Sequence, residues 1–454
     1  MKRLPAGDLL PRISVTPPGP ESRRLAAALR RCESPNVTYV ADDFPIFWRE
    51  AGGANVLDVD GNIYIDLTAG FGVAAAGHAN MRVNDAIRGQ LDRLVHGLGD
   101  VHPPEIKVTL LERLAQITPD GLTQSILASS GAEAVEAALK TARLASGAPG
   151  VLCFTGAYHG LTYGALAVTD GEAFRAPFQD QISVPVVRVP FPDPYRPPAE
   201  LAGHSDLAHG TLDLVAERLD AGADPIGAVI VEPILGRGGV VIPPTGFLPG
   251  LRQECDRRGL ILIVDEIYTG LGRTGSWFAC DHEAVVPDLL CLGKALSGSL
   301  PFSACIGRPE IMAAWPPSEG AAIHTSTFLG HPLACAAALA HLDEIQERGL
   351  VARSADLGEE LFRRLQALQG RVPGVGHVRG RGLLAGIELV RDPDSRAPDS
   401  NRAHQVVVEA LRRGLILLAD GPAANVLTLT PPLTISEEQL DFGLRTLEDC
   451  LLAA

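Results

Sequence analysis

The stretch that decides the fold is Leu260-Ile-Leu-Ile-Val-Asp-Glu-Ile-Tyr-Thr-Gly-Leu-Gly-Arg-Thr-Gly275. It opens with five apolar residues, and two carboxylates, Asp265 and Glu266, follow them directly. Further short apolar runs alternate with helical patterns along the chain, at 151–154, 226–231, 289–292 and 304–306. Runs of this length between helices are typical of strands that are buried on both faces of a mainly parallel sheet. The sequence therefore predicts an α/β fold whose large domain has a mainly parallel central sheet.

The two ends of the chain predict a second, smaller α+β domain. Residues 54–66 alternate apolar and polar side chains around Asp60-Gly61, which is a strong hairpin signal. After about residue 341 the pattern predicts a helix over 342–369, strands over 383–390 and 426–429, and a last helix that opens at Ser436 with capping-box spacing. We expect three segments: an N-terminal arm with part of the small domain (1–66), the large domain (67–340) and the C-terminal small domain (341–454).

Composition excludes several classes of partner. The chain has 454 residues, with 39 Lys+Arg against 54 Asp+Glu and a formal net charge of −15. A scaffold for nucleic acid or for an anionic membrane surface needs a basic face, so we expect neither partner. No apolar stretch approaches the roughly 20 residues that span a bilayer, and the N-terminus lacks the apolar core of a signal peptide. Eight scattered cysteines without a C-x-x-C pair favour a reducing, cytoplasmic location.

Lysine is scarce in this chain. Only four lysines, Lys2, Lys107, Lys140 and Lys294, stand among 35 arginines. Arginine cannot replace lysine where the chemistry needs a primary amine that loses its proton. Lys2 lies in a polar tail, and Lys107 and Lys140 lie in amphipathic patterns that predict solvated helix positions. Lys294 differs, because it follows an apolar run with strand character at 288–293.

Four places that follow predicted strands or open predicted helices carry groups suited to ligand binding. Ligands of open α/β sheets bind at the carboxyl ends of the strands. The small residues at 127–134 would bind an anion at a helix start, or serve as an ordinary N-cap. Asp265-Glu266 would meet a cation or cap local backbone, and Lys294 would carry chemistry or sit in a surface turn. The hydroxyl-rich segment 324–330 would bind phosphate oxygens or cap the helix after Pro332.

Together these groups match the needs of one cofactor. Pyridoxal phosphate requires a lysine for its aldehyde, an anion that keeps its ring nitrogen protonated, and a cradle for its phosphate. The amine, the carboxylate, the small-residue turn and the hydroxyl cluster supply these functions. The sequence therefore predicts a pyridoxal 5'-phosphate enzyme.

A family resemblance supports this interpretation. It rests on Ser130-Gly-Ala-Glu-Ala-Val-Glu136, Tyr158-His-Gly160, Glu232-Pro233, Asp265 to Gly275, Gly293-Lys-Ala295 and Ser326-Thr-Phe328, in that order. The chain resembles the class III pyridoxal-phosphate-dependent aminotransferases, the family of 4-aminobutyrate and acetylornithine aminotransferases, over about residues 35–450. The resemblance implies the fold-type I architecture and a homodimer with active sites at the subunit interface, with a tetramer of two dimers as the alternative.

The resemblance also implies roles for single residues. Lys294 would form a Schiff base with the cofactor and then move the proton between substrate and cofactor. Asp265 would pair with the ring nitrogen, and Glu232 matches a carboxylate near the substrate amine. The remaining positions implied to bind the cofactor are Ser130, Gly131, Ala132, Tyr158, His159, Tyr268 and Thr327. Of these, Gly131 and Ala132 would offer backbone N–H groups to the phosphate, Tyr158 would stack on the ring, and Thr327 would reach the phosphate of the partner chain's site. Tyr268 departs from the family pattern, because glutamine is common at this position, but its hydroxyl would still bond the ring 3-oxygen.

The chain departs from the family pattern at positions that select the substrate. Arginines common in the family are replaced by Leu161, after His-Gly, and by Thr428, in the strand before Pro-Pro-Leu. Either arginine would hold a carboxylate, so their loss argues against 4-aminobutyrate or acetylornithine as the default substrate. Leu161 and Phe71 are packing residues or mark a more apolar pocket. Arg237 is a nearby cation that would pair with Glu232 in place of a lost partner.

The leading hypothesis for the function is an aminotransferase. It would move an amino group between an amino acid or other amine and a 2-oxo acid, through the Lys294 Schiff base and a pyridoxamine intermediate. The alternative is an amino-acid racemase or epimerase on the same scaffold, acting on an apolar amino acid. A third possibility is a non-catalytic relative that binds the cofactor, which the presence of Lys294 and Asp265 disfavours.

Overall fold

The computed structural model describes residues 7–222 and 225–454, so Lys2 lies outside the described residues. The chain divides into two compact units, one of Met1–Met81 with Asp356–Ala454 and one of Arg82–Ala355. Both chain ends thus contribute to the same unit. The segment boundaries expected from the sequence, 66/67 and 340/341, stay predictions.

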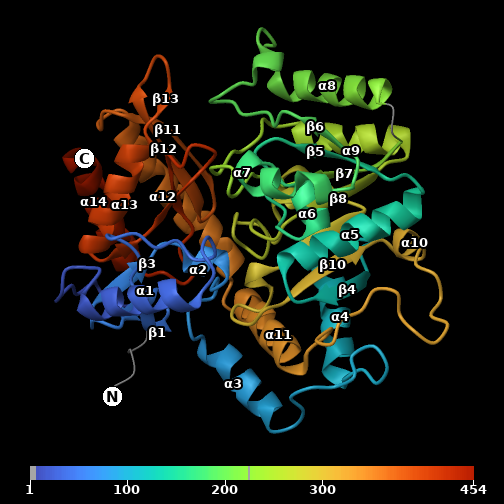
Figure 1. The fold of residues 1–454 in the computed structure, drawn as a ribbon, viewed down its shortest axis with the longest axis horizontal. Coiled ribbons are helices and arrows are strands. Elements are labelled where there is room, and N and C mark those ends of the chain that lie inside the picture. The colour runs from blue at the N-terminus through green and yellow to red at the C-terminus, as the bar shows by residue number, and fades with distance from the viewer. Residues whose placement is uncertain (1–6, 223–224) are drawn as a thin grey trace. The chain divides into compact units, whose positions relative to one another are not determined.

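The unit of residues 82–355 is built on a seven-stranded sheet in the order β4-β10-β9-β8-β7-β5-β6 (Figure 1). Its strands are β4 (Gln124–Ala128), β5 (Gly150–Phe154), β6 (Val186–Val189), β7 (Ile226–Val231), β8 (Ile261–Asp265), β9 (Leu289–Leu292) and β10 (Ser303–Gly307). The pairings β6-β5-β7-β8-β9 are parallel, and β10 alone runs against its two neighbours. All five apolar runs of the sequence are strands of this sheet. The predicted α/β fold with a mainly parallel sheet is confirmed.

This unit also contains helices, several of which pack on the sheet. They are α3 (Met81–Leu91), α4 (Glu105–Ile117), α5 (Gly131–Ser146), α6 (Tyr163–Val168), α7 (Glu172–Arg175), α8 (Leu207–Ala221), α9 (Phe247–Arg258), α10 (Pro309–Met312) and α11 (Pro332–Glu347). Helix α5 lies across β4, β10, β9, β8 and β7, while α8 and α9 pack on each other and on β6 and β8 (Figure 1). The alanine-rich inner face of α5 is buried from Ala134 to Ala142, which allows it to lie close to the strands.

Two of the lysine expectations are tested in this unit. Lys140 is exposed on α5, as predicted. The solvated position expected for Lys107 on α4 is wrong, because the side chain is half-buried and its Nζ donates a hydrogen bond to the carbonyl oxygen of Gly99 at 2.7 Å. Burial lowers the pKa of Lys107.

The unit formed by the chain ends contains two further sheets. One has the order β1-β2-β3-β14, and the other has the order β11-β12-β16-β15 with β13 paired to β12. The bounds are α1 (Pro20–Cys32), β1 (Trp48–Gly52), β2 (Asn55–Asp58), β3 (Ile63–Asp66), α2 (Ala69–Gly72), β11 (Val375–Arg381), β12 (Leu384–Asp392), β13 (Ala397–Pro398), α13 (Ser400–Arg412), β14 (Leu415–Ile416), β15 (Leu418–Asp420), β16 (Val426–Leu429) and α14 (Glu437–Ala453). Strand β14 runs parallel to β3 and thereby joins the two ends of the chain in one sheet.

Three predictions made from local sequence patterns concern the hairpin around Asp60-Gly61, the start of the last helix and the helix over 342–369. The hairpin around Asp60-Gly61 is present as the antiparallel pair β2-β3, and Ser436 caps α14 with the full capping box. The single helix expected over 342–369 is wrong, because α11 ends at Glu347 and α12 (Leu350–Gln369) begins after Gly349, whose φ is 60°. A left-handed φ is incompatible with a continuing helix, and glycine adopts it at little cost.

No helix in the described part of the chain is both long enough and apolar enough to cross a membrane.

Candidate active site

Lys294 occupies a strained turn at the carboxyl end of β9. The strand ends at Leu292, and Lys294 begins a short 3-10 turn with φ at 41°. A residue other than glycine in the left-handed region costs on the order of 1–3 kcal/mol, and such strain persists where the surroundings fix the side chain. The Lys294 ammonium lies over the Tyr268 ring, with Nζ 4.2 Å from the ring centroid. The turn therefore aims the amine at a defined place beside the sheet.

Asp265 ends the neighbouring strand β8 and is only 4% exposed. Its Oδ2 lies 2.7 Å from Nδ1 of His159, and its Oδ1 accepts the backbone N–H of Ile267 at 3.0 Å. The proton of this contact belongs on Nδ1, since an ionised carboxylate only accepts. The backbone N–H of buried His159 donates to Oγ1 of Thr169. Both oxygens of Asp265 are thus fixed in orientation while the carboxylate keeps further accepting capacity.

The start of α5 has the geometry expected of an anion-binding turn. Ser130 is the N-cap and shares a capping box with Glu133, whose Oε2 accepts the N–H groups of Ser129 and Ser130. The N–H groups of Gly131 and Ala132 have no hydrogen-bond partner among the described residues. Both alternatives for this segment therefore hold: it is an ordinary N-cap, and it leaves two donors at the positive end of the helix dipole for an anion.

One side chain links this helix start to the lysine turn. A Cβ atom built on Gly131 would lie 3.0 Å from Cδ1 of Ile267, and one built on Gly293 would lie 3.3 Å from Cγ2 of the same residue. Ile267 is therefore packed closely against both turns. The sequence analysis gives Ile267 no role; a glycine as the first residue of a helix and another directly before the key lysine are the signal of close packing that points to such a neighbour.

Glu232 follows β7 and is buried. Its Oε1 accepts the N–H of Tyr158 at 2.8 Å, and its Oε2 accepts the N–H of Gly236 at 2.9 Å. Burial raises the pKa of Glu232. The pairing expected between Glu232 and Arg237 is wrong, because backbone N–H groups hold the carboxylate and the Arg237 guanidinium stacks on rings instead, 4.6 Å from the centroid of Tyr158.

A cavity of about 310 Å³ brings the predicted residues together. It is lined by nine of the ten residues expected at the site: Ser130, Gly131, Ala132, Tyr158, His159, Glu232, Asp265, Tyr268 and Lys294. Leu161, Arg237 and Ile267 line it as well. The tenth residue, Thr327, is exposed and does not line this cavity; its contribution to a partner chain's site stays a prediction.

The hydroxyl-rich segment does not cap α11. The N-cap of that helix is His331, which makes no side-chain capping bond, and Thr325 instead donates to Oδ2 of Asp100 at 3.0 Å. The alternative of a structural cap for 324–330 is therefore wrong.

Thr428 and Phe71 belong to the other unit. Thr428 is buried in β16, and its Oγ1 has no hydrogen-bond partner within the described chain. Phe71 is exposed, with φ at 62°.

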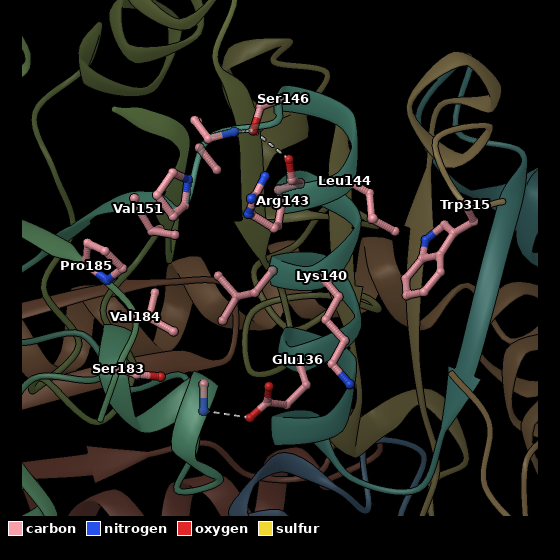
Figure 2. Close-up of a pocket in the computed structure, with 18 of the residues that line it drawn as sticks. Glu136, Lys140, Arg143, Leu144, Ser146, Val151, Ser183, Val184, Pro185 and Trp315 are labelled. Carbon is pink, nitrogen blue, oxygen red and sulfur yellow. Dashed lines mark hydrogen bonds between the residues drawn. The ribbon is translucent and has the colours of Figure 1, made fainter. Parts of the chain in front are cut away.

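A larger cavity of about 570 Å³ lies elsewhere along α5 and contains none of the expected residues. Figure 2 shows its lining, which includes Glu136, Lys140, Arg143 and Trp315. Lys140 lies 3.2 Å from Nδ1 of His324, and Glu136 accepts the N–H of Gly164 at 2.8 Å. The charged groups of this cavity are engaged in holding loops to the helix.

The residues of the smaller cavity fit pyridoxal phosphate. Two unpartnered backbone donors at a helix start suit a phosphate, a buried carboxylate with spare accepting capacity suits a protonated ring nitrogen, and an amine lies in the same cavity. No group of three or more His, Cys, Asp or Glu side chains in the described chain has the arrangement of a metal site.

Comparison with known proteins identifies the class. The family model "Aminotransferase class-III" matches residues 38–451. The chain is 39% identical to a 4-aminobutyrate aminotransferase of Mycobacterium leprae, covering 96% of each protein, and 32% identical to an alanine/serine racemase of Pyrococcus horikoshii, covering 96% of this chain and 92% of the racemase. Its structure is similar to that of an amine transaminase from an uncultivated Pseudomonas species in the pyridoxal-phosphate-bound form, with a TM-score of 0.86, 31% identity, and 93% and 98% of the two chains covered.

The chain belongs to the class III aminotransferases. It is a pyridoxal-phosphate-dependent enzyme that transfers amino groups between an amino donor and an oxo acid, as the resemblance implied.

Proposed function

We propose that the cavity of about 310 Å³ is the active site of this aminotransferase, with Lys294 as the catalytic amine. The observation that carries the proposal is the convergence of Lys294 and Asp265 from adjacent parallel strands on one cavity. Lys140, which is exposed, lines the other cavity, where no buried carboxylate accompanies it. The site thus combines an amine and a buried anion as the cofactor requires.

The cofactor would be held at three points. The N–H groups of Gly131 and Ala132 would bind its phosphate at the start of α5, Tyr158 would pack on its ring, and Asp265 would accept a hydrogen bond from its ring nitrogen. When bound, pyridoxal phosphate supplies an aldehyde that captures amines and a ring that accepts an electron pair.

The chain's own residues then perform the proton transfers. Nζ of Lys294 would take the proton from the reacting carbon of the substrate and return it. Asp265 would accept the hydrogen bond of the protonated ring nitrogen, and the contact of His159 with Oδ2 orients its carboxylate. Glu232, fixed by two backbone donors, presents a buried carboxyl group near the place of the substrate amine.

The amino donor is proposed to be an amino acid or amine with an apolar side chain. Leu161, which lines the cavity and is 49% exposed, presents an aliphatic surface where family members often carry arginine. A carboxylate in that part of the cavity would be desolvated without a counter-charge. This argument disfavours 4-aminobutyrate and acetylornithine as default donors.

Racemisation of an apolar amino acid is the second candidate. The similarity to an alanine/serine racemase over nearly the full chain favours it. The same lysine and carboxylate would serve, with the proton returned to the opposite face of the reacting carbon.

The oligomeric state is proposed from the family resemblance, and the cellular location from the composition of the chain. We infer a homodimer with active sites at the subunit interface, in which the partner subunit's Thr327 completes the phosphate site; a tetramer of two such dimers is the alternative. The acidic charge and the scattered free cysteines support a cytoplasmic enzyme.

One experiment separates the two chemistries. The holoenzyme is incubated with leucine or alanine and no 2-oxo acid, and both 2-oxo acid and enantiomer content are measured. A transaminase releases one equivalent of 2-oxo acid per site and then stops until an acceptor is added. Continued formation of the mirror-image amino acid without release of 2-oxo acid would replace transamination by racemisation.

A donor panel tests the substrate class. Apolar amino acids are expected to give higher kcat/KM than 4-aminobutyrate. A strong preference for 4-aminobutyrate would contradict the argument from Leu161.

A further inference from the structure

Arg237 is the one arginine among the described residues that line the proposed active site, and it does not form the pairing with Glu232 that the sequence led us to expect. We propose that Arg237 binds the carboxylate of the amino acid and 2-oxo acid substrates. This inference rests on the proposed function, because it takes the same cavity as the place where the substrates react.

The backbone on both sides of Arg237 is fixed. Any side chain on Gly236 would clash with the Tyr268 ring, and a Cβ atom on Gly238 would lie 2.6 Å from the carbonyl oxygen of Gly156. The N–H of Gly236 donates to Glu232, and the N–H groups of Gly239 and Val240 return to the carbonyl of Gly236 at 3.1 Å. The loop is therefore preorganised, so little ordering is needed when a ligand binds Arg237.

The side chain is held by aromatic rings and not by an acid. Its guanidinium carbon lies 4.6 Å from the centroid of Tyr158 and 5.6 Å from that of Phe174, and these two rings meet edge to face at 5.9 Å. Within residues 7–222 and 225–454 no carboxylate forms an ion pair with Arg237. The side chain is also exposed, so its N–H groups are accessible to an incoming anion.

The charge of the cavity points to the same assignment. Asp265 and Glu232 are buried carboxylates held by His159 and by backbone donors, and Lys294 is reserved for the cofactor and the reacting proton. Leu161 brings no charge to the lining. Arg237 is therefore the remaining permanent cation along the described lining, and a planar guanidinium binds a carboxylate through two parallel hydrogen bonds.

The position of Arg237 beside Tyr158 also fits the places proposed for the cofactor ring and the substrate. Tyr158 is proposed to pack on the cofactor ring, so a cation stacked on Tyr158 is next to the place proposed for the ring and the substrate. A role of Arg237 in binding the cofactor phosphate is the competing assignment, and the test below distinguishes the two.

The test uses two unreactive probes of equal shape. 4-Methylpentanoate carries a carboxylate, and 4-methylpentanamide is its neutral counterpart; binding of each to the holoenzyme is measured by titration calorimetry. The wild-type enzyme is expected to prefer the carboxylate, and Arg237→Gln is expected to reduce this preference about 10- to 100-fold, the usual range for a charge-assisted contact. Arg237→Lys should retain part of the preference, because it keeps the charge but loses the fork.

The control variant is Arg143→Gln, which changes an arginine of the larger cavity. It should keep the wild-type preference for 4-methylpentanoate. Kinetics give an independent measure: in Arg237→Gln the ratio of kcat/KM for an apolar amino acid to that for 1-phenylethylamine, which has no carboxylate, should fall by the same factor, mainly through KM for the amino acid.

The outcomes separate this inference from the proposed function. An unchanged carboxylate preference in Arg237→Gln overturns the assignment of Arg237, even if wild-type transamination is confirmed. Loss of cofactor affinity in equilibrium dialysis without loss of carboxylate preference assigns Arg237 to the phosphate and also overturns it. Failure of the proposed function would show differently, as a wild-type enzyme that neither transaminates nor racemises although it still prefers the carboxylate probe.

Discussion

Two cavities lie along α5, and each contains a lysine. The larger, of about 570 Å³, presents Lys140 on an exposed helix face (Figure 2). Nζ of Lys140 lies 3.2 Å from Nδ1 of His324. The smaller, of about 310 Å³, contains Lys294 in a strained turn at the end of a buried strand. The amine of Lys294 shares its cavity with two buried carboxylates, whereas the charged groups around Lys140 are solvated or engaged in local contacts. The difference shows that placement at strand ends, and not cavity size, marks the chemistry.

The largest expected effect separates the two lysines directly. Lys294→Ala should lower transamination by at least about 10³-fold, because the amine serves both cofactor attachment and proton transfer. Lys140→Ala should stay near wild type. Borohydride reduction followed by peptide mapping should find the cofactor on the peptide of Lys294 and not on that of Lys140. Full turnover in Lys294→Ala would invalidate the site.

The next comparison is between one carboxylate of each cavity, Asp265 in the smaller and Glu136 in the larger. Asp265→Asn should lower kcat roughly 10²- to 10³-fold, since a neutral amide no longer stabilises a protonated ring nitrogen. Glu136→Gln, in the larger cavity, should change kcat little. The absorption spectrum of the bound cofactor should shift in Asp265→Asn alone. Equal losses in both variants would mean that Asp265 acts only through stability.

Glu266 tests whether burial of a carboxylate is enough for a role in the chemistry. It neighbours Asp265 but accepts hydrogen bonds from the Thr269 hydroxyl and the Cys280 N–H, and it lines neither cavity. Burial raises the pKa of Glu266 to about 7. The stability that this group contributes is therefore present below its ordinary pKa of 4.5 and is lost as the pH rises through about 7.

Glu266→Gln removes this titration. The free energy of unfolding of the variant minus that of wild type should rise by roughly 2–4 kcal/mol when the pH is raised from about 4.5 to 8, because only wild type loses stability on ionisation of Glu266. The kcat of the variant should change little. Chemical denaturation at both pH values measures the difference. Parallel pH profiles of wild type and variant would show that Glu266 does not titrate in this range.

The smallest expected effect concerns the start of α5. Gly131→Ala should weaken cofactor binding about tenfold, because the added methyl group is crowded by Ile267 and overpacking costs roughly 1–3 kcal/mol. The double variant Gly131→Ala/Ile267→Val should recover most of the affinity, measured by equilibrium dialysis. If the second change brings no recovery, the loss comes from the phosphate-binding backbone and not from Ile267.

Much of this was readable from the sequence where local chemistry and burial agree. The five apolar runs became strands, and Lys294 and Asp265 stand at strand ends because each follows such a run. Ser436 caps α14 within one turn, so its pattern is local and predicts the helix start. For 127–134 the same kind of pattern leaves an N-cap and an anion site as alternatives, and Ser130 is the N-cap in the structure.

Other features depend on contacts between distant residues. The edge strand β6 lies in a proline-dense stretch typical of a loop, and it forms by pairing with β5. The burial of Lys107 depends on Gly99 and Gly330, and the backbone donors that hold Glu232 come from Tyr158 and Gly236. Pairings of this kind follow from the three-dimensional fold, so a pattern along the chain does not reveal them.

Ile267 carries a consequence for enzyme design. Its side chain is packed against both Gly131 and Gly293, and a Cβ atom built on Gly293 would lie only 3.7 Å from Cα of Gly131. The phosphate-binding helix start and the lysine turn therefore meet closely, and one aliphatic side chain with no chemistry of its own packs against both. Libraries that aim to accommodate bulkier or shorter cofactor analogues should therefore begin at residue 267 and leave the charged residues as they are.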